Sequence, residues 1–140
     1  MFFYRRRVQF YETDAQGVVH HSNYAKYFEE ARGELLRSLG FPYSKLRGEG
    51  FEVVLLSICC EFLKPLIYDE DFCIEINLSH IDRFTFSFQY NLKVGDNMRA
   101  RGHTKHCITK RGRIVSVPHE VRDLLIQFFS GPYRHLESQR

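Results

Sequence analysis

The segment that follows Ser22 has the spacing of an amphipathic helix. From Tyr24 onward, apolar residues recur every three or four positions, which places them along one stripe of a helix. They are Tyr24, Tyr27, Phe28, Ala31, Leu35 and Leu39. Gly40 and Pro42 are expected to end this helix. At its start, the side chain of Ser22 or Asn23 is expected to accept hydrogen bonds from the first free backbone N–H groups.

Most of the later chain instead alternates apolar and polar residues, as strands with one buried face do. One apolar set contains Phe72, Ile74, Ile76 and Leu78, and the next contains Phe84, Phe86, Phe88, Tyr90, Leu92 and Val94. Gly95-Asp96-Asn97 then predicts a hairpin turn. Further strands are predicted over residues 3–10, 51–63, 98–109 and 114–117. A short helical turn is predicted from Pro42 to residues 48–50, and a last helix from Pro118 to Gly131-Pro132.

This order of elements predicts an α+β protein. A helix with a broad apolar stripe and strands with one apolar face bury both surfaces when an antiparallel sheet wraps around a long central helix. The chain has 140 residues, of which 44% are hydrophobic, and contains no internal repeat or linker. These values are typical of one domain with a proper core, so we expect a single domain over residues 1–140.

Charge and hydrophobicity exclude several classes of protein. The formal net charge of +3 is too small to indicate a nucleic-acid binder, and a solvated strand edge explains the run Arg5-Arg6-Arg7 equally well. No apolar stretch approaches the ~20 residues that a membrane-spanning helix needs, and no apolar signal core follows the basic N-terminal residues. We therefore expect a cytoplasmic protein without a membrane span.

The cysteines and histidines do not predict a metal site. The four cysteines form no Cys-x-x-Cys pair, and we interpret all of them as small apolar core or sheet residues; they are Cys59, Cys60, Cys73 and Cys107. Adjacent Cys59 and Cys60 should point to opposite faces of a strand. The spacing of His103 and His106 also sends them to opposite faces, and no partner ligand accompanies them.

One polar segment carries a resemblance to a known family. It reads Tyr11-Glu12-Thr13-Asp14-Ala15-Gln16-Gly17-Val18-Val19-His20-His21 and is followed by Asn23-Tyr24, Glu29 and Arg32. Together these residues resemble the strand, catalytic turn and central helix of the 4-hydroxybenzoyl-CoA thioesterase family of hotdog-fold proteins. The similarity is greatest to its bacterial branch of acyl-CoA thioesterases associated with the Tol-Pal gene cluster. Phe62-Leu63-Lys64-Pro65 and Val117-Pro118 add weaker support.

The resemblance extends over nearly the whole chain, and it implies both an assembly and a reaction. It implies a hotdog fold, a homodimer or homotetramer with sites at the subunit boundary, and hydrolysis of a short-chain or aromatic acyl-CoA with no cofactor beyond water. Within the signature, Glu29 and Arg32 lie three residues apart on the predicted helix, a spacing typical of a structural ion pair.

By this resemblance, Asp14 corresponds to the catalytic carboxylate and His21 to the residue at the entrance of the central helix. Thioester hydrolysis needs a nucleophile or an activated water, together with a stabilised oxyanion. Asp14 either attacks the carbonyl directly or acts as a general base toward water; the sequence leaves both open. The expected oxyanion donor is the N–H of His21 or a neighbour, at the positive end of the helix dipole. Gly17 would let the backbone approach the substrate closely.

Other residues are candidates for substrate binding. An apolar slot for the acyl group is expected from Val18, Val19, Tyr24 and the aromatic stripe over residues 84–90, although such a stripe is also typical of a core. The turn residues Arg83, Lys110 and Arg111 are candidates for binding the CoA phosphates.

Alternative interpretations stay open at this point. Without the resemblance, Asp14 followed by Gly17 is typical of a simple turn, and His21 of a polar residue at a helix start. A hotdog protein can also act on acyl carrier protein, where the positive charge would meet an acidic partner. A third interpretation is a non-catalytic module that binds acyl-CoA or nucleic acid.

Overall fold

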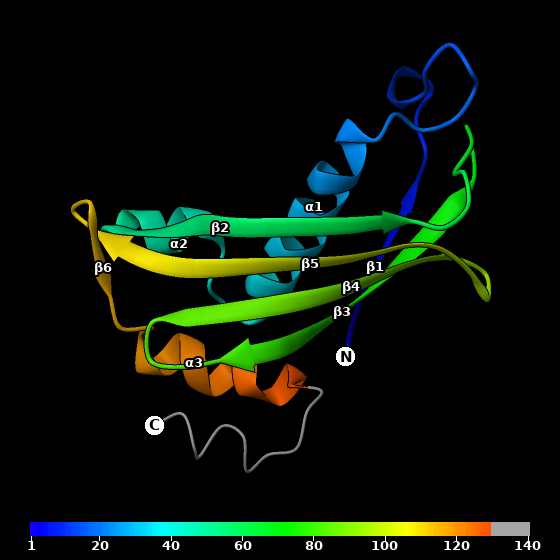
Figure 1. Cartoon of the computed structure of the whole chain (residues 1–140). Helices are drawn as coiled ribbons and strands as arrows, with labels where there is room; N and C mark the ends of the chain where they lie inside the picture. Colours follow the sequence, from blue (N-terminus) through cyan, green and yellow to red (C-terminus); the bar gives the residue numbers. More distant parts are fainter. Residues whose placement is uncertain (130–140) are drawn as a thin grey trace.

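An antiparallel sheet packed against a long helix forms the body of the protein (Figure 1). The computed structural model describes residues 1–129. In chain order the elements are β1 (Phe2–Arg7), the short 3-10 helix η1 (Phe10–Glu12), α1 (Ser22–Ser38), α2 (Tyr43–Gly48), β2 (Phe51–Phe62), β3 (Asp71–Ile81), β4 (Thr85–Val94), β5 (Asn97–Lys110), β6 (Arg113–Val115), α3 (His119–Leu125) and the short 3-10 helix η2 (Ile126–Phe128).

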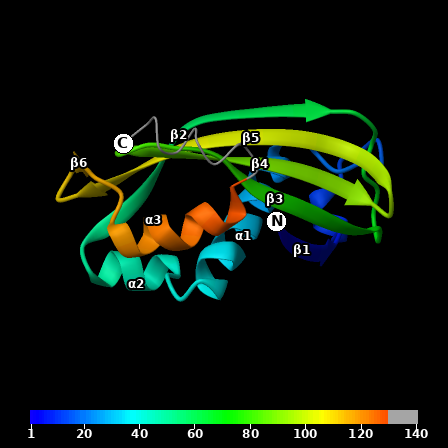
Figure 2. The ribbon, with the colours of Figure 1, turned by 90° about the horizontal axis from the view of Figure 1, so that it is seen from below.

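The six-stranded sheet has the order β1-β3-β4-β5-β2, with β6 paired to β5. Neighbouring strands are antiparallel throughout. Figure 2 shows α1, α2 and α3 together on one side of this sheet. The α+β arrangement predicted from the hydrophobic pattern is therefore confirmed.

The apolar stripe of α1 packs on the inner face of the sheet. Tyr27, Phe28, Ala31 and Leu35 have no exposed surface, and the same holds for the inward residues of β3 and β4, including Ile74, Ile76, Phe88 and Tyr90. The ring of Phe28 stacks on that of Tyr90, with 4.4 Å between the ring centroids. Alternation along the strands places these aromatic residues in the core, as the sequence pattern indicated.

Several element boundaries differ from those predicted. β1 ends at Arg7 rather than at residue 10, and Phe10 lies in η1. The chain leaves the sheet in a tight turn. This turn is closed by a hydrogen bond from the backbone N–H of Gln9 to the side chain of Glu12. The last strand, β6, ends at Val115. The predicted end of the last helix, Gly131-Pro132, lies outside the described residues.

The predicted ion pair between Glu29 and Arg32 is wrong. Both residues belong to α1, but Glu29 is exposed while Arg32 is buried. Arg32 lies on the flank of the helix that faces the interior, where it interacts with the hydroxyl groups of Tyr43 and Tyr90. The guanidinium therefore faces polar groups of two other elements instead of the exposed neighbour one turn away, and its Nε has no hydrogen-bond partner within residues 1–129.

The cysteines lie in strands, as expected. Cys59 and Cys60 belong to β2, Cys73 to β3 and Cys107 to β5, and all four are free thiols. His103 is exposed, whereas His106 is buried on the opposite face of β5. No group of three or more metal-ligating side chains occurs within residues 1–129. No helix in the same range is long and apolar enough to cross a membrane.

The strand β2 forms one edge of the sheet and differs from the other strands in its burial. Leu55, Leu56 and Ile58 are 46%, 48% and 43% exposed, although they are aliphatic residues in the middle of the strand. Because they lie along an unpaired edge, their apolar side chains are exposed and the backbone hydrogen-bonding groups of the edge are available for pairing.

The close packing of α1 on β5 yields the first testable prediction. A Cβ atom added at Gly102 would lie 2.3 Å from Cε2 of Phe28, which is too close without a shift of the ring. We expect Gly102→Ala to lower the free energy of unfolding by about 1–3 kcal/mol, measured by urea denaturation.

Gly48→Ala is the matched control for this prediction. Gly48 ends α2, and a Cβ atom there would have no heavy atom within 4 Å. Alanine should raise the stability at this position, by at most about 1 kcal/mol. Equal stability of Gly102→Ala and the wild type would show that Phe28 does not press on β5.

Candidate active site

Asp14 lies in a tight turn between β1 and α1. Its backbone N–H donates to the carbonyl of Val18 at 2.8 Å, and the N–H of Gly17 donates to the carbonyl of Asp14 at 3.0 Å. Gly17 closes the turn with a φ of +81°, a conformation that favours glycine. The side-chain Oδ1 of Asp14 accepts the N–H of Gln16 at 2.8 Å. The backbone therefore fixes Asp14, while Oδ2 accepts no hydrogen bond from residues 1–129.

The start of α1 is built differently from the prediction. His21 occupies the N-cap position, and neither Ser22 nor Asn23 caps the helix with its side chain. The buried Asn23 amide instead donates to the carbonyl of Glu12 at 2.9 Å. Nδ1 of His20 accepts the N–H of Ser22 at 3.2 Å, so the imidazole of His20 satisfies one of the free donors of the helix.

The backbone N–H of His21 is a free donor at the start of α1. No acceptor within residues 1–129 receives a hydrogen bond from it. The rings of His20 and His21 lie against each other, with centroids 4.1 Å apart. A partly charged N–H at the N-terminus of a 17-residue helix is suited to a ligand oxygen that gains negative charge.

Asp14 and the start of α1 line one pocket of about 330 Å³. The pocket brings together five of the predicted site residues, namely Asp14, Val18, Val19, His21 and Tyr24. Its opposite wall consists of residues that were not predicted as part of the site: Phe62, Leu63, Lys64 and Pro65. The resemblance had included this segment only as weaker support, and that was the signal that could have identified the wall.

Two aromatic rings form the apolar part of the pocket. Tyr24 and Phe62 meet edge to face, with ring centroids 4.9 Å apart. Burial raises the pKa of Tyr24 to about 12, so its hydroxyl group stays protonated near neutral pH. Of the 84–90 stripe, Phe86, Phe88 and Tyr90 are buried in the core beneath α1 and do not line this pocket, which is the core alternative that the sequence left open.

The structure does not bring the predicted phosphate-binding cations to this pocket within one chain. Phe62 lines the pocket, whereas Lys110 pairs with Phe51 at the other end of β2. Eleven residues of a strand at about 3.3 Å each separate these ends by roughly 36 Å. Arg111 follows in the β5–β6 turn, and Arg83 lies in the β3–β4 turn at that same end of the sheet (Figure 1).

Comparison with known proteins identifies the family to which this chain belongs. The model of the thioesterase-like superfamily matches residues 8–125, which include the pocket and most of the sheet. The chain belongs to this superfamily. The hotdog fold expected from the sequence is thereby confirmed, and the protein is a thioester hydrolase.

Individual relatives agree with this membership. A crystal structure of a hypothetical protein from Aquifex aeolicus has 61% sequence identity and a TM-score of 0.88, covering 89% of this chain and 99% of that chain. Acyl-CoA thioesterase YbgC of Haemophilus influenzae is 29% identical over 119 residues, covering 83% of this chain and 88% of the relative. The 1,4-dihydroxy-2-naphthoyl-CoA hydrolase of Thermosynechococcus vestitus is 29% identical over 121 residues, covering 85% of this chain and 79% of the relative.

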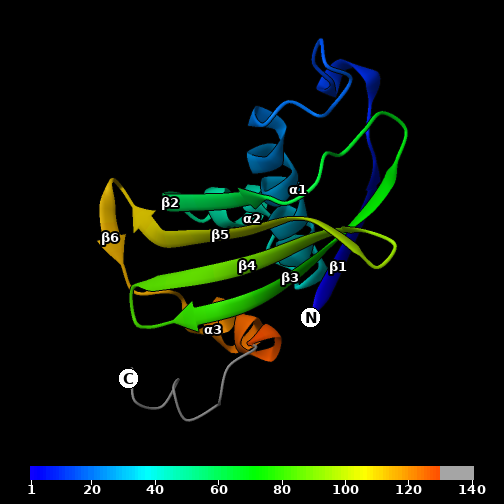
Figure 3. The same cartoon turned by 45° about the vertical axis from the view of Figure 1, so that its right-hand side comes forward.

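A half-buried ion pair holds the pocket wall at residues 62–65 in place. Arg99 on β5 donates to both carboxylate oxygens of Glu70 at 2.8 Å. It also donates to the carbonyl of Pro65 at 2.7 Å. The N–H of Val19 in turn donates to the carbonyl of Leu66 at 2.7 Å, which ties this wall to the turn of Asp14. Figure 3 shows the segment between β1 and α1 and the segment between β2 and β3 together at one end of the molecule.

This ion pair makes the stability of the thioesterase dependent on pH. The hydrogen bonds from Arg99 hold the pKa of Glu70 below its ordinary value of 4.5. Glu70 therefore contributes stability above that ordinary value, and the contribution is lost as the pH falls through the lower pKa of the folded state. We expect Glu70→Gln to cost about 1–3 kcal/mol at pH 7 in urea unfolding, with a smaller difference from the wild type at pH 3.

Glu34→Gln provides the control, since Glu34 forms an exposed ion pair with Arg37 within α1. Its effect at pH 7 should stay within about 0.5 kcal/mol. An equal cost of Glu70→Gln at pH 7 and pH 3 would show that the charge of Glu70 does not stabilise the pocket wall.

Proposed function

We propose that this thioesterase hydrolyses short-chain or aromatic acyl-CoA thioesters to the free acid and CoA. The observation that carries the proposal is one pocket lined by both Asp14 and His21, the residue whose free N–H lies at the start of α1. The names of the relatives, an acyl-CoA thioesterase and a naphthoyl-CoA hydrolase, support CoA thioesters as the substrate class. Because the turn and helix residues resemble its signature, we also assign the chain to the Tol-Pal-associated branch of the 4-hydroxybenzoyl-CoA thioesterase family.

The two sides of the pocket supply the two requirements of the reaction. The thioester carbonyl oxygen points at the N–H of His21, where the helix dipole stabilises the oxyanion as it forms. Oδ2 of Asp14 then either attacks the carbonyl carbon or removes a proton from the attacking water. In the first route, CoA leaves as a thiol and water hydrolyses the resulting mixed anhydride. In both routes one water is consumed, and one acid and one thiol are released.

The apolar wall of the pocket receives the acyl group. Val18, Val19 and Leu63 offer aliphatic surface, and the edge-to-face pair of Tyr24 and Phe62 offers two rings. A slot of about 330 Å³ lies at the small end of ligand pockets. Small or flat acyl groups therefore fit this wall better than long flexible chains do.

We further propose that two copies of the chain pair through β2. The open backbone edge and the exposed Leu55, Leu56 and Ile58 are suited to antiparallel pairing with the same strand of a second copy. A two-fold axis across β2 places the Phe51 end of one strand beside the Phe62 end of the other. Lys110 and Arg111 of a second subunit then approach this pocket, where they bind the CoA phosphates.

Arg83 adds to that positive surface from the neighbouring turn. It is exposed and lines a different cavity from Asp14, at the same end of the sheet as Lys110. In the paired arrangement this cavity belongs to the outer part of the CoA path. Face-to-face packing of two such dimers would give the tetramer, which the same sheet allows because its second face carries no described helix (Figure 2).

Asp14→Asn tests the catalytic role. A panel of short aliphatic and aromatic acyl-CoAs should show turnover by the wild type, measured as thiol release, and a loss of about 10²- to 10⁴-fold in kcat with the variant. The same acyl groups on acyl carrier protein distinguish the two thioester classes, because a CoA enzyme turns over the CoA thioesters faster.

Asp96→Asn is the matched control, since Asp96 lies exposed in the turn between β4 and β5 and does not line the pocket. It should have wild-type rates. Unchanged turnover in Asp14→Asn would remove Asp14 from the mechanism. Tight binding of acyl-CoA without thiol release from any member of the panel would favour the non-catalytic module.

Ile58→Lys tests the pairing through β2. A charge at this position would be buried without a partner, so we expect the dimer to dissociate by sedimentation velocity and the activity to fall with it. Ile114→Lys is the control, because Ile114 is 60% exposed on β6, on the other side of β5. A wild-type protein that sediments as a monomer while remaining fully active would contradict the shared site.

A further inference from the structure

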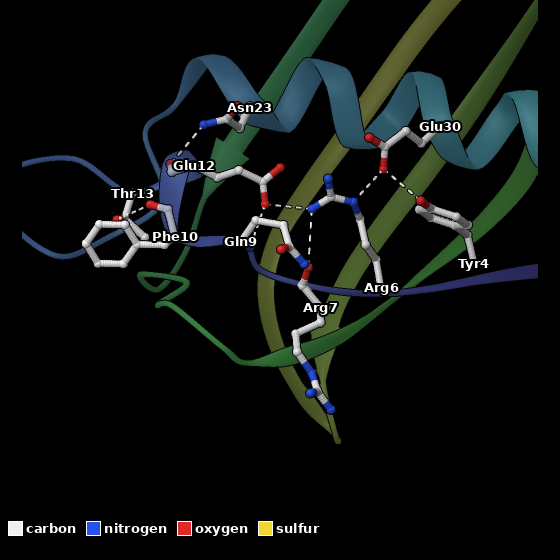
Figure 4. A network of polar contacts seen from close by, with 9 residues as sticks. All are labelled: Tyr4, Arg6, Arg7, Gln9, Phe10, Glu12, Thr13, Asn23 and Glu30. Carbon is white, nitrogen blue, oxygen red and sulfur yellow. Dashed lines mark hydrogen bonds and ion pairs between the residues drawn. The ribbon is translucent and has the colours of Figure 1, made fainter.

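Behind the turn of Asp14, a buried carboxylate connects β1 with the turn (Figure 4). Glu12 is 4% exposed, and its Oε1 accepts from Nη1 of Arg6 at 2.6 Å and from the N–H of Gln9 at 2.8 Å. Burial alone would raise the pKa of Glu12, but the hydrogen bonds from Arg6 and Gln9 outweigh it and lower the pKa. Glu12 is therefore ionised at neutral pH, and its charge is matched by Arg6.

The main chain of Glu12 forms a second junction, with the start of α1. Its carbonyl accepts from Nδ2 of Asn23 and from the N–H of His20, both at 2.9 Å. Both donors belong to the segment that begins the helix. One residue thus connects three parts of the molecule: β1 through its carboxylate, the turn through the chain itself, and the start of α1 through its carbonyl.

Arg6 continues this network to the body of the helix. Its Nε lies 2.8 Å from Oε1 of Glu30, which also accepts from the hydroxyl group of Tyr4 at 2.7 Å. The guanidinium lies over the ring of Tyr27 at 4.9 Å from the centroid. Figure 4 shows Arg6 between Glu12 and Glu30, so the arginine connects β1 to η1 through Glu12 and to the third turn of α1 through Glu30.

We propose that Arg6 and Glu12 are positioning residues, which set the separation between the Asp14 carboxylate and the N-terminus of α1. Neither residue lines the pocket, and both act on the reaction through Asp14. This inference rests on the proposed function of Asp14. It goes beyond that function because it assigns a role to a pair of residues that does not touch the substrate.

The physical argument compares the ion pair with its alternatives. Two apolar residues of similar size would stabilise a buried junction as well as, or better than, a charged pair. A carboxylate held between a planar guanidinium and a backbone N–H, however, fixes the orientation of the joined segments as well as their separation. A displacement of about 1 Å between reacting groups can cost about 10²-fold in rate, so direction matters most at this junction.

The test uses Glu12→Gln and Arg6→Gln, with Arg7→Gln as the matched control. Glutamine at position 12 keeps one acceptor oxygen but loses the charge that holds Arg6. Arg7 is the neighbour of Arg6 on the same strand, but it is exposed and pairs with Asp71 of β3. We expect kcat to fall about 10- to 100-fold in both network variants, with KM within about threefold of the wild type, and no change in Arg7→Gln.

A double mutant distinguishes positioning from loss of structure. In the Asp14→Asn background, Glu12→Gln should lower the residual rate less than twofold, because residues that act as one unit are not additive. A full further loss in that background would show that Glu12 acts on the fold in general, and would overturn the proposal. Assays are run well below the unfolding midpoint of each variant, determined by circular dichroism.

Arg6→Lys keeps the test decisive if the glutamine variants do not fold. Lysine retains the charge but lacks the planar fork that joins Glu12 and Glu30, so kcat should still fall at least threefold. Wild-type kcat in every network variant that folds, beside an inactive Asp14→Asn, would overturn the positioning role and leave the proposed function intact. Wild-type turnover in Asp14→Asn would instead remove Asp14 from the mechanism, and the absence of thiol release by the wild type would defeat the proposed function itself.

Discussion

The burial of one helix stripe on one sheet face is the constraint on which the rest of the structure depends. Phe28 stacks on Tyr90, and the absence of a side chain at Gly102 lets the helix approach β5 closely. Because interiors are close-packed, such a contact fixes the helix along its axis as well as its distance from the sheet. The start of α1 is thereby placed beside the end of β2, where Phe62 forms the far wall of the pocket.

The polar turn can form a site because its main chain is satisfied by its own neighbours. Asp14 and Gly17 bond within the turn, and Val19 bonds to Leu66 on the opposite wall. Buried backbone groups without partners would destabilise the loop, so these bonds hold an otherwise irregular segment in one conformation. Among the groups that stay unbonded within residues 1–129 are Oδ2 of Asp14 and the N–H of His21, which belong to two residues that line one pocket.

The sequence predicted the local half of the site and not the long-range half. Asp14, Val18, Val19, His21 and Tyr24 come together because they lie within eleven consecutive residues, 14–24, at a turn and a helix start whose signals are local. The wall at residues 62–65 depends on which strand lies beside the helix, and strand order is a tertiary property that alternation alone does not encode.

The errors have the same cause. Asn23 was expected to cap the helix, but its amide satisfies the carbonyl of Glu12, a partner eleven residues away. Arg32 was expected to pair within the helix, yet it interacts with Tyr43 and Tyr90 on other elements. For both residues the prediction assumed a partner close in the sequence, whereas the folded chain provides a partner from another element.

The edge strand links catalysis to assembly through a single residue. Phe62 lines the pocket on the inner face of the sheet, and it also ends the strand whose apolar side chains are left open. Pairing of β2 with a second copy would therefore change the surroundings of a pocket wall as well as bury the edge. In the proposed dimer, a second subunit would supply to this pocket the cations that lie near the Phe51 end of its β2. Within one chain that end is separated from the Phe62 end by roughly 36 Å. On this view the charge needed for binding and the carboxylate needed for hydrolysis are encoded in one chain but meet between two.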